Sequence, residues 1–138
     1  MNDMTAKARK IFAADRYATE LTGIEITSVG DHEATCTLTA TGAHCNARGM
    51  AMGGALYTLA DFAAAIAANS DCLDDGTLHW VSLDASVHYL SPAPAGSHLV
   101  AISKALKLGH STALYQTIIE SPDNGKRIVI VETTMIYT

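Results

Sequence analysis

The stretch from Asn46 to Asn69 constrains the fold most, because it sets a single carboxylate inside an otherwise uncharged apolar helical segment. Its second half, residues 55–69, is rich in Ala and Leu and contains neither Gly nor Pro, which predicts a helix. Apolar residues fall on every side, a pattern typical of a helix that is buried all round. The carboxylate, Asp61, costs several kcal/mol to bury unless it is paired, hydrogen-bonded or protonated. Asp61 is therefore either compensated structurally or retained for chemistry.

Two glycines, Gly53 and Gly54, precede this helix. The first backbone N–H groups of a helix have no internal partner, the helix dipole is positive there, and glycine lets a ligand oxygen approach closely. The pair therefore predicts an oxyanion hole. The alternative is that Gly53 serves only as a helix-entry glycine, which is a common use.

The spacing between Gly53 and Asp61 limits how the two can cooperate. Asp61 lies eight residues beyond Gly53, which is about 12 Å along a helix that rises ~1.5 Å per residue. Reacting groups must meet at roughly 3 Å. If both residues act on one substrate, they come from different chains, and the enzyme is at least a dimer with antiparallel helices.

Length and charge restrict the class of protein. The 138 residues predict one domain, 1–138, which buries about two thirds of its unfolded surface. The net charge of −5 and the lack of a basic block argue against nucleic acid as a partner. The N-terminus lacks the apolar core of a signal peptide, and no apolar tract is long enough to span a membrane. Three cysteines without CxxC spacing fit a reducing compartment, so we expect a cytoplasmic protein.

The remaining chain alternates between turn signals and segments of strand character. Helical spacing predicts an amphipathic helix from Thr5 to about Ala14, which Tyr17 to Leu21 would continue. Alternating or β-branched segments predict six antiparallel strands, at residues 23–29, 33–41, 78–90, 98–108, 111–120 and 127–137. Cys36 is expected in the core. An α+β fold follows, in which one sheet wraps the long helix and a second copy covers what remains exposed.

A motif spans the central stretch and a later strand. It comprises Asn46-x-x-Gly49-x-x-Met52-Gly53-Gly54, then Leu59-Ala60-Asp61, Val81-Ser82-Leu83-Asp84 and Tyr89-Leu90-Ser91-Pro92-Ala93. Over nearly its whole length the chain resembles the hotdog-fold acyl-CoA thioesterases of the phenylacetate-pathway (PaaI) type. The resemblance implies a curved antiparallel sheet of about six strands around one central helix, with an N-terminal helix. It also implies homodimers joined at their sheet edges, often assembled into homotetramers, which hydrolyse acyl- or aryl-CoA thioesters.

The resemblance also implies roles for individual residues. Asp61 would be the general base or nucleophile, and Gly53 of the other subunit would polarise the thioester carbonyl. Asn46 would orient the thioester or the water, and Ser82 would place the water. Many relatives carry His-Gly-Gly where this chain has Met52-Gly53-Gly54, and methionine can neither donate a strong hydrogen bond nor titrate. Either that histidine is dispensable here, or activity is lower, or the substrate differs.

Each catalytic role has a structural alternative. Asp61 could be a satisfied buried carboxylate bonded to Thr58 or Tyr57, and Asn46 could simply make a turn. Ser82 lies on the strand face opposite Val81 and Leu83, away from the expected core, so a local bulge would be needed to bring it round. The cysteine and histidine at positions 45 and 44 are adjacent on a loop and lack a third group, which argues against a thiol nucleophile.

Substrate contacts are predicted on the helix and on two hairpins. The pocket walls would include Met52, Gly54, Leu56, Tyr57 and Phe62, together with residues across the interface. The coenzyme A phosphates would meet cations chosen from Lys104, Lys107, His110, Lys126 and Arg127, although surface lysines are usually just solvated.

Cofactors and competing functions remain to be weighed. The six histidines show no i,i+4 or HxH spacing, so no metal site is predicted, and no redox cofactor is implied. A non-catalytic acyl-CoA binding or sensing protein is the competing function. A hotdog dehydratase or hydratase usually has an Asp-His pair, and no histidine follows Asp61 on the helix.

Overall fold

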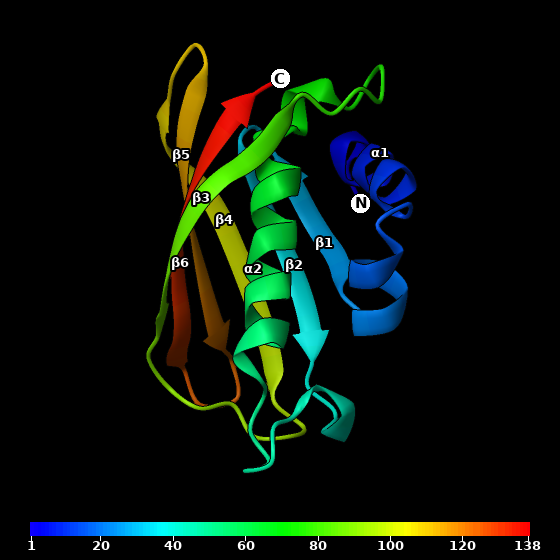
Figure 1. Ribbon diagram of the computed structural model, residues 1–138. Helices are drawn as coiled ribbons and strands as arrows, with labels where there is room; N and C mark the ends of the chain where they lie inside the picture. Colours follow the sequence, from blue (N-terminus) through cyan, green and yellow to red (C-terminus); the bar gives the residue numbers. More distant parts are fainter.

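The computed structural model describes residues 1–138 as one antiparallel sheet wrapped around a central helix (Figure 1). The central helix is α2 (Gly53–Ala68). The strands are β1 (Glu25–Gly30), β2 (Glu33–Thr39), β3 (Trp80–Tyr89), β4 (His98–Leu108), β5 (Thr112–Ser121) and β6 (Lys126–Tyr137). Their order in the sheet is β1-β2-β4-β5-β6-β3, and every neighbouring pair is antiparallel. The predicted α+β hotdog architecture is confirmed.

The N-terminal helix α1 (Asp3–Phe12) packs beside β1 at one edge of the sheet (Figure 1). The Asn2 side chain caps it by accepting from the Thr5 N–H at 2.7 Å, and Asp3 in the first turn suits the positive end of the dipole. Thr5 is itself buried, and its hydroxyl accepts from the Val29 N–H of β1. A π-helical turn, Tyr17–Thr22, follows in place of the predicted continuation of the α-helix.

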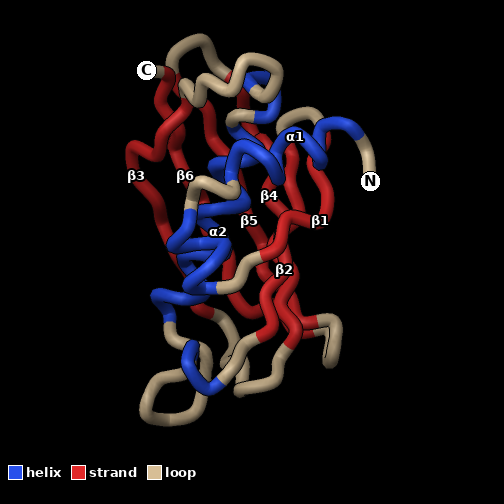
Figure 2. Tube along the Cα trace, turned by 90° about the vertical axis from the view of Figure 1, so that its right-hand side faces the viewer, coloured by secondary structure: helices blue, strands red, loops and turns tan.

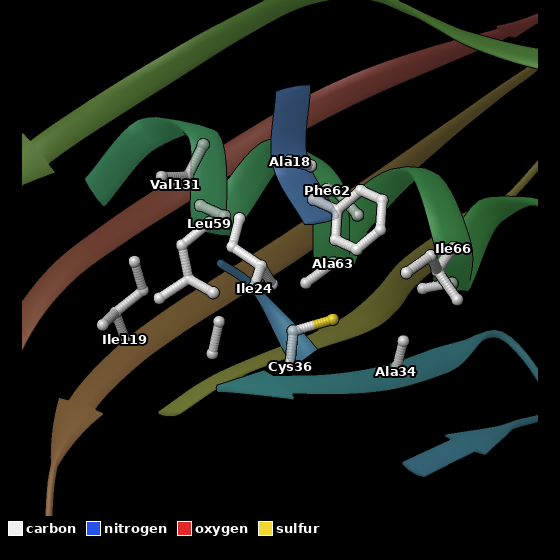
Figure 3. Packing of buried hydrophobic residues seen from close by; sticks show 14 of the residues in the cluster. Ala18, Ile24, Ala34, Cys36, Leu59, Phe62, Ala63, Ile66, Ile119 and Val131 are labelled. Carbon is white, nitrogen blue, oxygen red and sulfur yellow. The ribbon is translucent and has the colours of Figure 1, made fainter. Parts of the chain in front are cut away.

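The core lies between α2 and the concave face of the sheet (Figure 3). Leu59, Ala63 and Ile66 of α2 are fully buried against the strands. The small alanine side chains, such as Ala63, let the helix lie close to the sheet. Cys36 of β2 lies in this core as predicted, and burial raises the pKa of its thiol to about 12.

One side of α2 remains partly uncovered, contrary to the predicted all-round burial. Gly54, Thr58, Asp61 and Ala65 follow one another at helical spacing and are all partly or fully exposed. We call these four residues the open stripe. The sheet covers one side of the helix and the N-terminal segment another, so a single chain has nothing left to cover the third.

The strand β3 departs from simple alternation at a bulge between Ser82 and Asp84. Ser82 lies opposite the buried Met135, whereas Val81 and Leu83 are 47% and 57% exposed. The bulge inserts one residue, so the face of the strand reverses along its length. The prediction that Val81 and Leu83 face the core is therefore wrong, while Val87 further along is partly buried against it.

The edge strands of the sheet are β1 and β3 (Figure 2). Helix α1 packs against β1, whereas β3 has no neighbour on its outer side. Both faces of β3 are largely exposed. None of the helices is long and apolar enough to cross a membrane.

Candidate active site

Asp61 lies in the open stripe, midway along α2. The Ser82 hydroxyl donates to Asp61 Oδ1 at 3.3 Å, and this is the only hydrogen bond that the Asp61 carboxylate accepts within the chain. Neither Thr58 nor Tyr57, the two partners considered for a structural Asp61, makes a hydrogen bond to its carboxylate. Thr58 donates to the Gly54 carbonyl at 2.8 Å, and Tyr57 makes no hydrogen bond to Asp61. The carboxylate is therefore incompletely compensated within one chain.

The surroundings of Asp61 make it a stronger base than an ordinary carboxylate. Burial raises the pKa of Asp61, the hydrogen bond from Ser82 lowers it, and the negative charge of Asp15 raises it, with a net upward shift. Burial raises the pKa of the Tyr57 phenol, and the negative charge of Asp61 raises it further. A raised carboxyl pKa brings the group nearer the working range of a general base at neutral pH.

Ser82 reaches Asp61 because two features fix β3 against α2. The bulge turns the Ser82 side chain inward, where the sequence pattern alone placed it outward. Near the end of α2, the buried Asn69 side chain clamps the start of β3. It accepts from the Trp80 N–H at 3.0 Å and donates to the Trp80 carbonyl at 3.0 Å.

The start of α2 presents two free donors. Met52 occupies the N-cap position without a side-chain hydrogen bond, and the N–H groups of Gly53 and Gly54 have no acceptor within the chain. The Met52 carbonyl accepts from both Ala55 and Leu56. Unpaired N–H groups at a helix N-terminus suit an anion or a developing oxyanion.

Tyr89, at the end of β3, packs directly on this first turn. Its hydroxyl donates to the Gly53 carbonyl at 3.2 Å. A Cβ atom at position 53 would lie 3.1 Å from the Tyr89 ring, whereas one at position 54 would meet nothing within 4 Å. The contact explains why residue 53 has no side chain, beyond the helix-entry role considered from sequence.

A cleft of about 530 Å³ opens beside Gly53. Asn46 lines it, and the Asn46 Oδ1 atom accepts from the N–H groups of Arg48 and Met50. Asn46 thus makes the predicted turn and also faces the cleft with its amide nitrogen free of chain partners. Asp61 is not among the lining residues, which are Asn46, Arg48, Met50, Ala51, Gly53, Leu56, Tyr89, Leu90, Ser91 and Pro92.

The predicted pocket residues divide between two clefts and the core. Leu56 lines the cleft beside Gly53, while Met52 and Gly54 line a second cleft of about 240 Å³ together with Tyr17 and Leu21. Tyr57 is partly exposed beside Asp61. Phe62 is 4% exposed, packs edge-on against Phe12 at 5.9 Å between ring centroids, and lines neither cleft. Its place in a pocket wall is not supported, because its helical phase points it into the core.

None of the predicted cations lines the Gly53 cleft. Lys107 and His110 lie at the β4–β5 hairpin, at the opposite end of the molecule from the start of α2 (Figure 1). Lys104 is 3.9 Å from Glu33, and Arg127 is 3.5 Å from Glu120. Lys126 begins β6 on the separate β5–β6 hairpin. No group of three or more His, Cys, Asp or Glu side chains is arranged to hold a metal ion.

Among the cleft residues that the sequence did not predict as site residues, Arg48 and Tyr89 offer polar groups of chemical interest. Arg48 forms no ion pair and lines the cleft. It is the only Lys or Arg between positions 17 and 103, and this isolation could have marked it in the sequence as a candidate site residue. Tyr89 belongs to the motif described above, but nothing in the sequence indicated its contact with Gly53, which joins residues 36 positions apart.

Comparison with known proteins places this arrangement in a family. Residues 48–128 match the model of the thioesterase superfamily. A putative esterase from Archaeoglobus fulgidus is 32% identical over 94 residues, which are 68% of this chain and 56% of that protein. The chain therefore spans little more than half the length of this relative.

Solved structures agree along nearly the whole chain. The E. coli PaaI protein, from the phenylacetic acid degradation operon, superposes with a TM-score of 0.84 at 26% identity and covers 99% of this chain and 96% of its own. A hypothetical thioesterase with coenzyme A from Streptococcus pneumoniae superposes with a TM-score of 0.81 at 24% identity, covering 94% and 96%, and shows the shared fold. By its sequence match and by its hotdog architecture, which it shares with a protein of the PaaI type, the chain belongs to the thioesterase superfamily.

Proposed function

We propose that the protein hydrolyses acyl- or aryl-CoA thioesters at a site shared between two copies of the chain. One observation carries this proposal: the cleft beside Gly53 lacks an acid, while Asp61 lies partly exposed on the same helix, eight residues away. That separation is about 12 Å along the axis, too far for the two to meet on one carbonyl. A second copy with its helix antiparallel supplies the missing partner to each.

The proposed reaction follows from these groups. Asp61 takes a proton from water as the water oxygen attacks the thioester carbonyl carbon. The oxyanion that forms is stabilised by the Gly53 N–H of the other protomer, and Ser82 and Asn46 orient the water and the thioester. The C–S bond then breaks, and coenzyme A leaves as a thiolate that takes up a proton. The alternative is direct attack by the Asp61 carboxylate, which gives a mixed anhydride and thiolate before water releases the acid.

Labelled water separates the two routes. During one turnover in H₂¹⁸O, the general-base route places the label in the product acid. Hydrolysis of a mixed anhydride at the Asp61 carbonyl instead places the label in the protein. Mass spectrometry of the acid and of the peptide that contains Asp61 distinguishes these outcomes.

The exposed parts of the chain support the dimer. The strand β3 is a free edge with both faces exposed, and the open stripe lies alongside it on α2. Free strand edges pair readily with another strand. Pairing of β3 with its counterpart about a two-fold axis would extend the sheet, cover the stripe and bring Asp61 to the neighbour's cleft; further assembly would give a homotetramer.

Complementation between two inactive variants tests the shared site. Asp61→Asn and Gly53→Val each disable one half of it, the latter because a branched side chain at position 53 would crowd Tyr89 and obstruct the first turn of α2. In a mixed dimer, one of the two sites regains an intact Asp61 and an intact Gly53. Random mixing should therefore restore about a quarter of wild-type activity, given two-fold symmetry. A site contained within one chain would restore none.

The coenzyme A phosphates are proposed to meet Arg48 within the cleft and Lys107 and His110 from the partner. Arg48 has no competing ion pair, so it is available to an anion. Arg48→Glu should raise the KM for CoA thioesters more than for short thiol mimics that lack the nucleotide. An equal effect on both would remove the nucleotide contact.

A non-catalytic acyl-CoA sensor is the second candidate. The observation that favours it is Met52, which is 52% exposed at the helix entrance and offers no hydrogen bond to a substrate. A panel of CoA thioesters, with free thiol followed spectroscopically and binding followed calorimetrically, separates the two functions. Binding without thiol release favours the sensor.

A further inference from the structure

Tyr89 contacts the start of α2 through its ring and through its hydroxyl. The ring lies against the Gly53 Cα, as the 3.1 Å approach of a hypothetical Cβ demonstrates, and the hydroxyl donates to the Gly53 carbonyl at 3.2 Å. The side chain is 55% exposed and makes no other hydrogen bond. Ring carbons and the hydroxyl oxygen both lie beside Gly53, and the hydroxyl adds a hydrogen bond that a phenyl ring could not make.

The accepting carbonyl matters because of the peptide group to which it belongs. The Gly53 carbonyl and the Gly54 N–H are the two ends of one peptide unit, so a hydrogen bond to the carbonyl polarises the N–H. The preceding unit is arranged in the same way. Its carbonyl, on Met52, accepts from Ala55 and Leu56, and its N–H is that of Gly53. Both free donors at the helix start therefore belong to peptide units whose carbonyls are hydrogen-bonded.

We propose that Tyr89 is a positioning residue for a two-donor oxyanion hole formed by the N–H groups of Gly53 and Gly54. This role rests on the proposed thioester hydrolysis. Tyr89 fixes the first turn of α2 from the side of β3 and strengthens the Gly54 donor through the shared peptide unit. Residue 54 is exposed, and a Cβ at that position would meet nothing within 4 Å.

The competing role for Tyr89 is a direct contact with substrate, because it also lines the 530 Å³ cleft. The two roles differ in kinetics. A hydroxyl that binds the substrate equally in the ground and transition states changes KM, whereas one that strengthens the hole changes kcat. They also differ without any substrate, because only the positioning role alters the Gly54 amide in the free protein.

The test compares Tyr89→Phe with Tyr137→Phe. Tyr137 is a matched control, since it is 50% exposed and stacks on His79 at the other end of β3. Steady-state kinetics on a CoA thioester are measured together with ¹⁵N-glycine spectra, in which the ten glycines give a small set of signals. We expect Tyr89→Phe to lower kcat about threefold to tenfold with KM unchanged, which is the effect of one modest hydrogen bond. The Gly54 amide signal should move, and Tyr137→Phe should change neither quantity.

Several results would overturn the inference. Wild-type kcat in Tyr89→Phe, a rise in KM alone, or an unmoved Gly54 amide would each remove the positioning role while thioester hydrolysis by the wild type stands. A wild-type protein that hydrolyses no thioester would overturn the proposed function itself and this role with it. Unfolding curves for both Phe variants establish that a lower kcat does not come from loss of folded protein.

Discussion

The two sides of α2 differ in their surroundings: one packs against the sheet, and the other, the open stripe, is partly exposed. On the side facing the sheet, Leu59, Ala63 and Ile66 are fully buried and carry no charge. On the open stripe, the Asp61 carboxylate accepts one hydrogen bond within the chain, and Gly54 and Ala65 are small. The buried side stabilises a single chain. On the stripe, partial burial of the Asp61 carboxylate carries a desolvation cost that the contacts within one chain do not fully offset. Variants on the two sides should therefore separate stability from activity.

The largest expected effect is on the open stripe. Asp61→Asn should lower kcat/KM for thioesters by about a hundredfold to ten-thousandfold, the usual contribution of a general base. The raised pKa of Asp61 in the folded state means that ionised Asp61 opposes folding as pH rises through that pKa. The variant should therefore unfold at a higher temperature than the wild type at pH 7. Asp31→Asn, in an exposed turn, is the control and should change neither; full activity in the Asp61 variant would contradict the assignment.

The buried side should respond in the opposite way. Leu59→Ala removes a fully buried side chain between α2 and the sheet and should lower the free energy of unfolding by about 2–5 kcal/mol. Urea denaturation measures this loss. Activity per folded molecule should stay near that of the wild type, and a matching loss of activity would show that the two sides of the helix are not separable.

Ser82→Ala should give a smaller and more specific change. The Ser82 hydroxyl lowers the pKa of Asp61 by bonding to its carboxylate, so its removal should raise that pKa further. The acid limb of the pH profile of kcat/KM should move to higher pH. Ser86→Ala on the same strand is the control, and an acid limb that stays in place would disconnect Ser82 from the base.

The smallest effect is expected beneath the helix, where three hydroxyls are buried without partners: Ser103, Thr117 and Thr133. Thr117→Val keeps the shape and removes the unpaired hydroxyl, so the free energy of unfolding should rise by about 1 kcal/mol or stay unchanged. Urea denaturation measures it. A loss of more than about 1 kcal/mol would indicate a buried water that the hydroxyl holds.

The sequence predicted the elements better than their exposed surfaces. Apolar content and the absence of breakers located the long helix, and alternation located six strands. The bulge between Ser82 and Asp84 reversed a strand face without a sign in the pattern, because one extra residue changes phase but not composition. The apolar residues on every side of α2 likewise overstated its burial. They show that the helix can be buried all round, but a single chain has no further element to cover the open stripe.

The candidate site was predictable where it depends on local spacing and was not where it depends on distant contacts. Asp61 and Gly53 followed from a charge in an apolar helix and a glycine pair at its start. Phe62 was misplaced because apolar character does not distinguish a core side chain from a pocket wall. Tyr89 was missed because its contact with Gly53 exists only once β3 has folded beside α2.

The clamp between Asn69 and Trp80 closes off the ten residues that separate them. The position of Ser82 relative to Asp61 is transmitted through the end of the helix and not through that connection. The exposed residues 74–78 can therefore be lengthened or labelled with little effect on chemistry, provided that Ser70 keeps its bond to the His32 N–H and Leu73 stays in the core. That makes the segment a natural insertion point for a reporter.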